Sequence, residues 1–194
     1  MKKTISFDLD DTLFDVVELF IKYSNKNWKT NLDFKNLQDS DRIFQGLTDE
    51  QENALWVKFL ENKETMEIKP KPAVKAAVDA LSKKYRLITI SARDPILQPS
   101  GRAWIKKHFP GKFDKIIFKK SKSGNKKKSK ICKKEKAILH IDDNVKHIHD
   151  CLKHEIPSIL INRPWNKKVK VNTKRINEVS LKEIESFISE LNLS

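Results

Sequence analysis

Short apolar runs that alternate with helix-like segments constrain the fold of this chain more than any other feature. Residues 85–92 read YRLITISA, 114–118 read DKIIF, 137–141 read AILHI and 157–161 read PSILI. These apolar, β-branched runs are typical of strands, and the segments between them are predicted to be helices. Strands that alternate with helices indicate an α/β fold, a Rossmann-like parallel sheet flanked by helices on both faces.

The opening segment, MKKTISFDLDDTLFD, brings three carboxylates together directly after another strand pattern. Ile5 and Phe7 alternate with small polar residues, and Asp8, Asp10 and Asp11 follow at once. A single aspartate at this place would be typical of a turn. Neighbouring carboxylates repel one another unless a cation or a proton relieves them, so we expect positive charge here.

The segment between the first two predicted strands differs from the rest of the chain. Residues 16–70 show helical patterns only, and Pro70 and Pro72 mark the start of the next helix. We therefore predict a Rossmann-like core formed by residues 1–15 and 71–194. Residues 16–70 would be a small helical cap inserted after the first strand.

Two of the predicted helices begin with the spacing of a capping box, in which two side chains satisfy backbone N–H groups reciprocally. Thr48 and Gln51 have this spacing inside the predicted cap. Ser180 and Glu183 have it at the start of the last amphipathic helix. We expect a capping box at both places.

A lysine-rich segment carries most of the net charge of the chain, which is formally +14. Residues 119–136 contain ten lysines and one glutamate, and so account for +9 of that total. Such a block is usually a solvated loop, but it can also attract polyanions such as nucleic acid. Because no aromatic residue lies within it, the segment offers no platform on which bases could stack.

The sequence gives no sign of a membrane or an oxidising environment. No apolar run approaches the roughly 20 residues that cross a bilayer, and no apolar signal region follows the first residues. The two cysteines, Cys132 and Cys151, lack metal-ligand spacing and are interpreted as buried, reduced thiols, with a disulfide as the less favoured alternative. We expect a cytoplasmic protein; its oligomeric state is not predicted.

Polar side chains follow three of the predicted strands. Asp8 ends the first, Ser91 ends the second, and Asp142 and Asp143 end the strand AILHI. Ligands of such sheets bind outside the carboxyl ends of the strands. Hard cations such as Mg²⁺ take oxygen ligands, so Asp8, Asp142 and a backbone carbonyl are candidate ligands.

Zinc is a less favoured metal for this site. His147 and His149 form the sequence HIH, but two residues apart on a predicted helix they point to different faces. We interpret both histidines as surface or packing residues.

Three motifs at these strand ends resemble those of the haloacid dehalogenase-like hydrolases, and they occur in the order of that superfamily. FDLDDTL resembles the first motif, DxDx[TV]; ITISAR resembles the second; LHIDDN resembles the fourth. The third motif is a lysine upstream of the last pair of carboxylates. The spacing in KSKICKKEKAILHIDD points to Lys128, with Lys127 and Lys130 as alternatives.

The superfamily resemblance covers the chain outside the predicted cap, and a narrower resemblance is also visible. TISARD, AWIKKHFPGKFDKIIF, HIDDN and ILINRPWN are similar to the cytosolic 5′(3′)-deoxyribonucleotidase branch and its bacterial and viral relatives. Position 11 departs from that branch, because this chain has Asp11 where glycine is usual. The aromatic residues that stack on the base in the cap of that branch cannot be matched residue by residue.

The resemblance implies a set of roles for these residues. Asp8 would be the nucleophile that forms an aspartyl-phosphate, and Asp10 would be the general acid and base. Mg²⁺ would be bound by Asp8, the carbonyl of Asp10 and Asp142, with Asp143 acting through water. The substrate-binding residues would be Ser91, Ala92, Arg93 and Lys128.

The function implied is a Mg²⁺-dependent phosphatase acting on small phosphomonoesters, and the narrower resemblance implies a 5′-nucleotidase for (deoxy)nucleoside monophosphates. One alternative is a phosphatase of nucleic-acid 3′ or 5′ phosphate ends, recruited through residues 119–136. Another is a non-catalytic nucleic-acid-binding protein, which would have no need of the pair Asp8 and Asp10.

Several of these residues also have purely structural interpretations. Ser91 and Arg93 could cap the helix that follows them, and Asp143 could be the N-cap of the helix VKHIHDCL. Residues 164–166, Pro-Trp-Asn, could either turn the chain after the last predicted strand or take part in the site.

Overall fold

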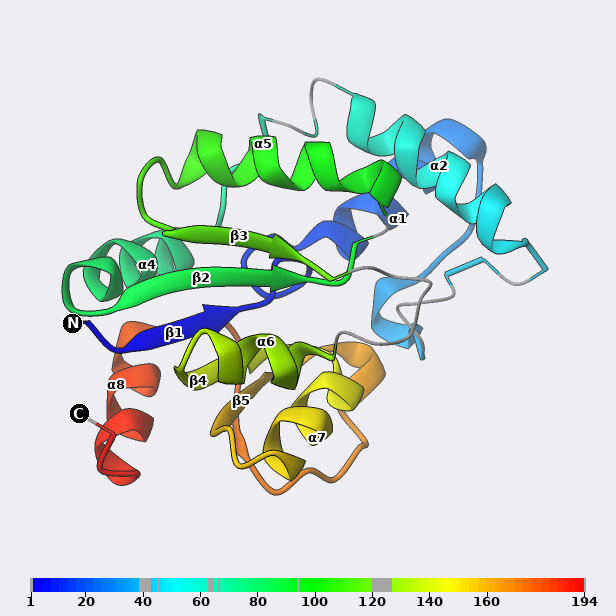
Figure 1. The fold of residues 1–194 in the computed structure, drawn as a ribbon. Helices are drawn as coiled ribbons and strands as arrows, with labels where there is room; N and C mark the ends of the chain where they lie inside the picture. Colours follow the sequence, from blue (N-terminus) through cyan, green and yellow to red (C-terminus); the bar gives the residue numbers. More distant parts are fainter. Residues whose placement is uncertain are drawn as a thin grey trace.

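Six parallel strands form one sheet in the computed structural model, with helices on both of its faces (Figure 1). The structure describes residues 2–38, 43–44, 46–62, 65, 67–93, 95–119 and 127–193. The strands are β1 (Thr4–Phe7), β2 (Arg86–Ser91), β3 (Lys115–Phe118), β4 (Ala137–Asp142), β5 (Ser158–Ile161) and β6 (Lys174–Ile176). The α/β, Rossmann-like fold predicted from the sequence is confirmed.

The helices fill the intervals between the strands. The α-helices of the described part are α1 (Val16–Trp28), α2 (Asp49–Glu61), α4 (Pro72–Lys84), α5 (Gln98–His108), α6 (Lys128–Lys134), α7 (Val145–Lys153) and α8 (Leu181–Glu190). Three short 3-10 turns join them: η1 (Phe34–Asn36), η2 (Pro95–Leu97) and η3 (Pro164–Asn166).

Apolar side chains pack on both faces of the sheet, as expected for parallel strands covered by helices. On one face, Leu87 of β2 belongs to the large core that includes side chains of α4, α5 and α8. On the other face, Ile88 and Ile90 of the same strand pack with Cys132 of α6 and Cys151 of α7. Successive side chains of β2 therefore point to opposite faces of the sheet and pack into two different hydrophobic cores.

The strand order places the first and fourth strands side by side. The order is β3-β2-β1-β4-β5-β6, so the chain first builds the sheet away from β1 on one side and then on the other. Phe7 pairs with Ile141, and the residues that follow them are Asp8 and Asp142. Ligands bind at the carboxyl ends where the strand order reverses in this way, and the two aspartates lie at that point.

Residues 16–70, called here the helical segment, contain no strand in the part that the structure describes. One face of α1 is buried through Val16, Val17, Phe20 and Ile21. The expected capping box at the start of α2 is present and joins Thr48 to Gln51. In Figure 1, α1 and α2 lie near the carboxyl ends of β1 to β3, and α2 contacts η2.

The end of the chain differs from the sequence analysis in two ways. The sequence analysis did not identify β6, which pairs with β5 at the edge of the sheet. The capping box expected at Ser180 is absent: Ser180 occupies the N-cap position of α8, but its side chain makes no capping hydrogen bond. Glu183 forms an ion pair instead, with its Oε2 3.2 Å from Nζ of Lys174, because β6 brings that lysine close.

Both cysteines are buried and not bonded to each other, which confirms the expectation of free thiols.

Within the described residues, no helix combines the length and the apolar character needed to span a bilayer.

Candidate active site

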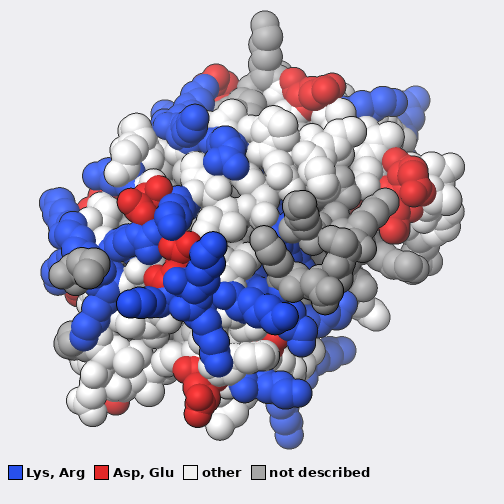
Figure 2. All heavy atoms as spheres, in the orientation of Figure 1, with Lys and Arg blue, Asp and Glu red and all other residues white. Residues whose placement is uncertain are grey.

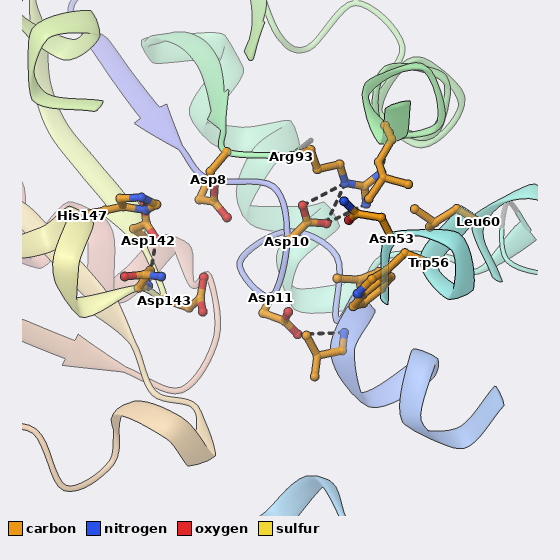
Figure 3. Close-up of a pocket in the computed structure, with 15 residues that line it drawn as sticks. Asp8, Asp10, Asp11, Asn53, Trp56, Leu60, Arg93, Asp142, Asp143 and His147 are labelled. Carbon is orange, nitrogen blue, oxygen red and sulfur yellow. Dashed lines mark hydrogen bonds and ion pairs between the residues drawn. The ribbon is translucent and has the colours of Figure 1, made fainter. Parts of the chain in front are cut away.

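Three buried carboxylates meet where β1 and β4 end. Asp8 follows β1, Asp142 ends β4 and Asp143 comes next, and each offers an oxygen within 4.8 Å of the others. Their side chains lie together in Figure 3. Asp8 is 5% exposed and its backbone N–H donates to the carbonyl of Ile141 at 2.8 Å, which ties the start of the acidic loop to β4.

Lys128, the first residue of α6, lies between two of these carboxylates. Its Nζ donates to Asp8 Oδ1 at 2.5 Å and to Asp142 Oδ2 at 2.7 Å, and its side chain is fully buried. Lys127 is exposed and lies 3.5 Å from Asp150, and Lys130 is exposed as well. Of the three lysines left open by the sequence, the structure brings Lys128 to the acidic cluster.

The pKa values of the cluster diverge because the single lysine cannot compensate three buried carboxylates. Burial raises the pKa of Asp8 to about 7; Lys128 lowers it, while Asp142 and Asp10 add to the rise. Burial and the neighbouring carboxylates also raise the pKa of Asp143 well above its usual range. Burial alone would raise the pKa of Asp142, but Lys128 and nearby histidines outweigh it and hold that pKa well below the usual range.

Two histidines approach Asp142 from β4 and α7. His140 Nε2 lies 2.9 Å from Asp142 Oδ2, and its Nδ1 lies 2.9 Å from the hydroxyl of Ser6. His147 Nδ1 lies 3.2 Å from the same carboxylate oxygen, and His147 lines the pocket. The interpretation of His147 as a surface or packing residue is therefore wrong, whereas His149 is exposed as expected.

Arg93 holds Asp10 in an ion pair from the loop after β2 (Figure 3). Its Nε donates to both carboxylate oxygens of Asp10, at 3.1 and 2.9 Å, and its Nη2 donates to Oδ1 at 2.6 Å. The other end of the guanidinium donates to the hydroxyl of Ser100 at 3.0 Å. A Cβ at Gly101 would lie 3.0 Å from Arg93 Nη1 and 2.9 Å from Leu9 Cδ2, so glycine gives the arginine room against α5.

The other residues expected after β2 lie beside this pair. Ser91 is buried and its Oγ accepts the backbone N–H of Arg93 at 3.1 Å, while Ala92 lines the pocket. Helix α5 begins at Gln98 with Leu97 in the N-cap position. The alternative in which Ser91 and Arg93 cap that helix is therefore wrong.

The backbone at position 11 is one that aspartate can adopt in place of the usual glycine. Its φ of 55° lies in the left-handed region, which glycine adopts freely and aspartate tolerates better than most residues. The carboxylate is buried, and its Oδ1 accepts the N–H of Val17 at 3.3 Å. Asp11 thus links the acidic loop to the first turn of α1.

One face of α2 closes the pocket above the carboxylates. The pocket has a volume of about 260 Å³, and Asn53, Trp56 and Leu60 line it from the helical segment. Their spacing of three and four residues places them on the same helical face. Trp56 stacks on Phe20 with ring centroids 3.7 Å apart. The sequence analysis did not identify these residues; the spacing was visible, but nothing local showed that this face meets the strand ends.

Two side chains of the turn η3 hold Asp143 by hydrogen bonds. Trp165 Nε1 donates to Asp143 Oδ2 at 2.9 Å, and Asn166 Nδ2 donates to the carbonyl of Asp143 at 2.7 Å. The N-cap of α7 is Asn144, whose side chain accepts the N–H of Lys146. Asp143 is therefore not the N-cap, because its carboxyl group is directed to Trp165 instead.

Residues 120–126 of the lysine-rich segment lie outside the described residues. Figure 2 shows Lys and Arg side chains gathered on the face of the molecule around α6. Lys119, at the start of the segment, places its Nζ 3.5 Å from His147 Nε2.

The comparisons with known proteins agree with this geometry. The family model described as 5′ nucleotidase, deoxy (pyrimidine), cytosolic type C protein (NT5C) matches residues 2–189. No curated protein matches the sequence. None of the comparisons supports a nucleic-acid partner.

Solved structures share the whole fold at low sequence identity. A haloacid dehalogenase-like family hydrolase from Streptococcus pneumoniae is 16% identical with a TM-score of 0.70, over 97% of this chain and 98% of that one. A predicted phosphatase from Clostridium acetobutylicum is 18% identical with a TM-score of 0.67, over 98% and 99%. A hydrolase of the same superfamily from Bacillus subtilis, solved bound to magnesium, is 15% identical with a TM-score of 0.63, over 98% and 99%.

These structures support the fold, and the family model supports the assignment within it. Because that model covers nearly the whole chain, the resemblance inferred from the sequence is confirmed. The chain has the fold of these haloacid dehalogenase-like hydrolases. It belongs to the cytosolic type C 5′-nucleotidase family and is a nucleotidase-like phosphoric monoester hydrolase.

Proposed function

We propose that the protein is a Mg²⁺-dependent phosphatase that transfers the phosphoryl group of a nucleoside 5′-monophosphate to Asp8 and then to water. The observation that carries this proposal is the position of Asp8. It lies at the floor of a pocket, 2.5 Å from the Lys128 ammonium group and beside Asp142 and Asp143, with Asp10 two residues away.

The donor set supports a magnesium site. Three buried carboxylates share one region, and two of them, Asp8 and Asp143, have pKa values raised by burial and by neighbouring carboxylates. A divalent cation removes this repulsion, and carboxylate oxygens are the ligands that Mg²⁺ prefers. Asp8, Asp142 and the carbonyl of Asp10 would hold the ion, with Asp143 acting through water. Once bound, Mg²⁺ would neutralise negative charge on the nucleophile and the phosphate.

The side chains supply the nucleophile and the protons. A carboxylate oxygen of Asp8 attacks phosphorus, the bond from phosphorus to the leaving oxygen breaks, and Asp10 gives that oxygen a proton. Water then attacks the aspartyl-phosphate, Asp10 takes a proton from it, and the bond between Asp8 and phosphorus breaks to release phosphate. Lys128 and Ser91 stabilise the charge on the phosphoryl oxygens.

Arg93 takes part in the proposed reaction because it forms an ion pair with Asp10. A phosphate entering beside Ala92 competes with the Asp10 carboxylate for the guanidinium, since both are anionic oxygen acceptors. Transfer of Arg93 to the phosphate frees Asp10 to take up a proton and to act as the acid.

The helical segment supports a nucleotide as substrate. Trp56 offers a flat indole in the pocket, and Asn53 offers an amide that can donate to and accept from the edge of a base. We assign residues 16–70 as a cap over a catalytic core of residues 1–15 and 71–194. The cytosolic description of the family supports a cytoplasmic location.

The test is a phosphate-release assay of the purified protein on p-nitrophenyl phosphate, nucleoside 5′-monophosphates, sugar phosphates and oligonucleotides phosphorylated at either end. We expect turnover that requires Mg²⁺, stops with EDTA and is fastest on nucleoside monophosphates. Full activity in metal-free buffer would overturn the metal site. Faster turnover on oligonucleotide ends would favour a nucleic-acid substrate.

A further inference from the structure

We propose that Trp165 is a positioning residue of the metal site: its indole N–H orients the carboxylate of Asp143, and its ring links that carboxylate to Phe34 of the helical segment. This inference rests on the proposed function. It assigns a specific role to the turn η3, for which the sequence analysis left two interpretations open: turning the chain or taking part in the site.

The turn fixes both the backbone and the side chain of Asp143. Trp165 Nε1 donates to Asp143 Oδ2 at 2.9 Å. Asn166 Nδ2 donates to the carbonyls of Asp143 and Ile161, at 2.7 Å each, and Asn166 is itself buried. Because Ile161 ends β5, these contacts anchor Asp143 to the sheet.

The turn is rigid enough to impose an orientation. Asn166 Oδ1 accepts the backbone N–H of Arg163 at 3.0 Å and a guanidinium N–H of Arg175 at 3.0 Å. Pro164 begins the 3-10 turn and restricts its backbone further. Trp165 therefore projects from a turn whose own polar groups are satisfied.

The chemistry of the indole suits this task. An indole nitrogen only donates, so Trp165 can contact the buried carboxylate of Asp143 only as a donor, and its N–H is directed to Oδ2. The other carboxylate oxygen would then be available to a cation or to a water bound to it. Outer partners of this kind orient metal-binding groups, and their loss typically costs about 10–100-fold in metal affinity.

The same indole touches the helical segment. The rings of Phe34 and Trp165 meet edge to face, with centroids 5.9 Å apart and planes at 87°. In Figure 1, the light blue turn that holds residue 34 lies beside the orange turn that holds residue 165, and η1 and η3 are in contact. A shift of η1 would therefore move the group that holds Asp143.

The test compares direct Mg²⁺ binding by substrate-free proteins, measured by isothermal titration calorimetry. Trp165→Phe keeps an aromatic ring and removes the N–H, and Trp28→Phe, at the end of α1, is the matched control. We expect the dissociation constant to rise by about 10-fold or more in W165F and to stay unchanged in W28F. Wild-type affinity in folded W165F would overturn the proposal.

A second variant tests the link to the helical segment. Phe34→Leu keeps an apolar side chain but removes the ring that meets Trp165. We expect weaker Mg²⁺ binding than in wild type, with a smaller loss than in W165F. Unaltered affinity in F34L would remove Phe34 from the proposal.

A measurement on the wild-type protein does not depend on whether W165F folds. The chain has four tryptophans, so its ¹⁵N NMR spectrum holds four indole signals, which Phe variants of the other three assign. We expect Mg²⁺ to shift the Trp165 signal and to leave that of Trp28 in place. An unmoved Trp165 signal in protein that binds Mg²⁺ would overturn the inference alone, whereas wild type that neither binds Mg²⁺ nor releases phosphate would overturn the proposed function with it.

Discussion

Arg93 holds Asp10 in an ion pair that a general acid has to leave before it can donate a proton. Three contacts from the guanidinium, between 2.6 and 3.1 Å, hold the carboxylate in place. In the proposed mechanism, an incoming phosphate would draw Arg93 away from this carboxylate. Asp10 would then be held beside Asp8 by the ion pair and released when the substrate binds.

Replacing Asp10 by asparagine tests this role. Turnover of a nucleotide should fall by about 10²–10⁴-fold, because the amide neither protonates the leaving oxygen nor accepts a proton from water. The loss should be smaller on p-nitrophenyl phosphate, whose leaving group needs little protonation. The exposed Asp49→Asn is a suitable control. Equal losses on both substrates would count against the general-acid role.

Asp142 should be needed for the metal more than for the chemistry. Asp142→Asn keeps the shape of the side chain but removes the charge that faces Lys128, His140 and His147. We expect the Mg²⁺ concentration for half-maximal rate to rise by more than about 10-fold. Losing a residue that only orients a metal ligand already costs about 10-fold or more in metal affinity, and loss of a ligand should cost more. An unchanged Mg²⁺ requirement in a metal titration would exclude Asp142 as a ligand.

The sequence predicted the residues of the site whose positions follow from the strands. Asp8 and Asp142 come directly after paired residues of β1 and β4, so their proximity follows from the sheet alone. His147 was not identified as part of the site. The spacing of two residues shows that His147 and His149 lie on different faces of α7, but it does not show which of these faces meets Asp142. That choice depends on how α7 docks against β4, which no local pattern encodes.

In helix α2, too, the features set by neighbouring residues could be predicted, whereas those set by packing against other helices could not. Its capping box could be predicted because Thr48 and Gln51 act within one turn. Its contribution to the pocket could not, because Trp56 reaches the site only through packing of the helix on α1. Similarly, β6 has three residues and exists by pairing with β5, so its own sequence carries too little signal.

The face of α2 should decide substrate preference. Trp56→Leu keeps an apolar contact with Phe20 and removes the flat ring. Base stacking on an aromatic side chain is worth about 1–3 kcal/mol, so KM for a nucleotide should rise roughly 5- to 150-fold. Kinetics on p-nitrophenyl phosphate should change little, and Val57→Ala, on the same helix but outside the pocket lining, should affect neither substrate. Parallel losses on both substrates would contradict base stacking.

At the scale of the whole molecule, the two ends of the helical segment converge on one aspartate. Asp15 Oδ1 accepts from Arg163 Nη2 at 2.6 Å, and Asp15 Oδ2 lies 2.7 Å from Lys71 Nζ. Arg163 also donates from Nε to the carbonyl of Asp11 at 2.8 Å. A residue after β5 thus joins the acidic loop to the point where the chain enters the helical segment.

The two ion pairs of Asp15 should differ in their contribution to stability. The Arg163 side chain is 9% exposed and that of Lys71 is 48% exposed. We expect Arg163→Met to lower the free energy of unfolding by about 1.5–3 kcal/mol, as for hydrogen bonds to charged groups. Lys71→Met should cost less than about 1 kcal/mol, since exposed pairs contribute little. Urea denaturation of both variants measures this difference, and equal losses would contradict it.

The topology explains why so much of the architecture could be inferred. Parallel strands joined by helices leave few possible arrangements, and a reversal in strand order brings two strand ends together. What the sequence could not supply is the placement of the helical segment over that reversal. That placement comes from contacts between distant residues, such as those of Asp15 with Arg163 and of Phe34 with Trp165.

The central claim is that Asp8 carries the phosphoryl group during turnover. Acid quenching of the enzyme during turnover of a nucleoside monophosphate, followed by proteolysis and mass spectrometry, tests it directly. We predict phosphate on Asp8 in the wild-type protein, and none in Asp8→Asn, which should keep its circular dichroism spectrum but release no phosphate. Phosphate on another residue, or turnover by folded D8N, would contradict the account.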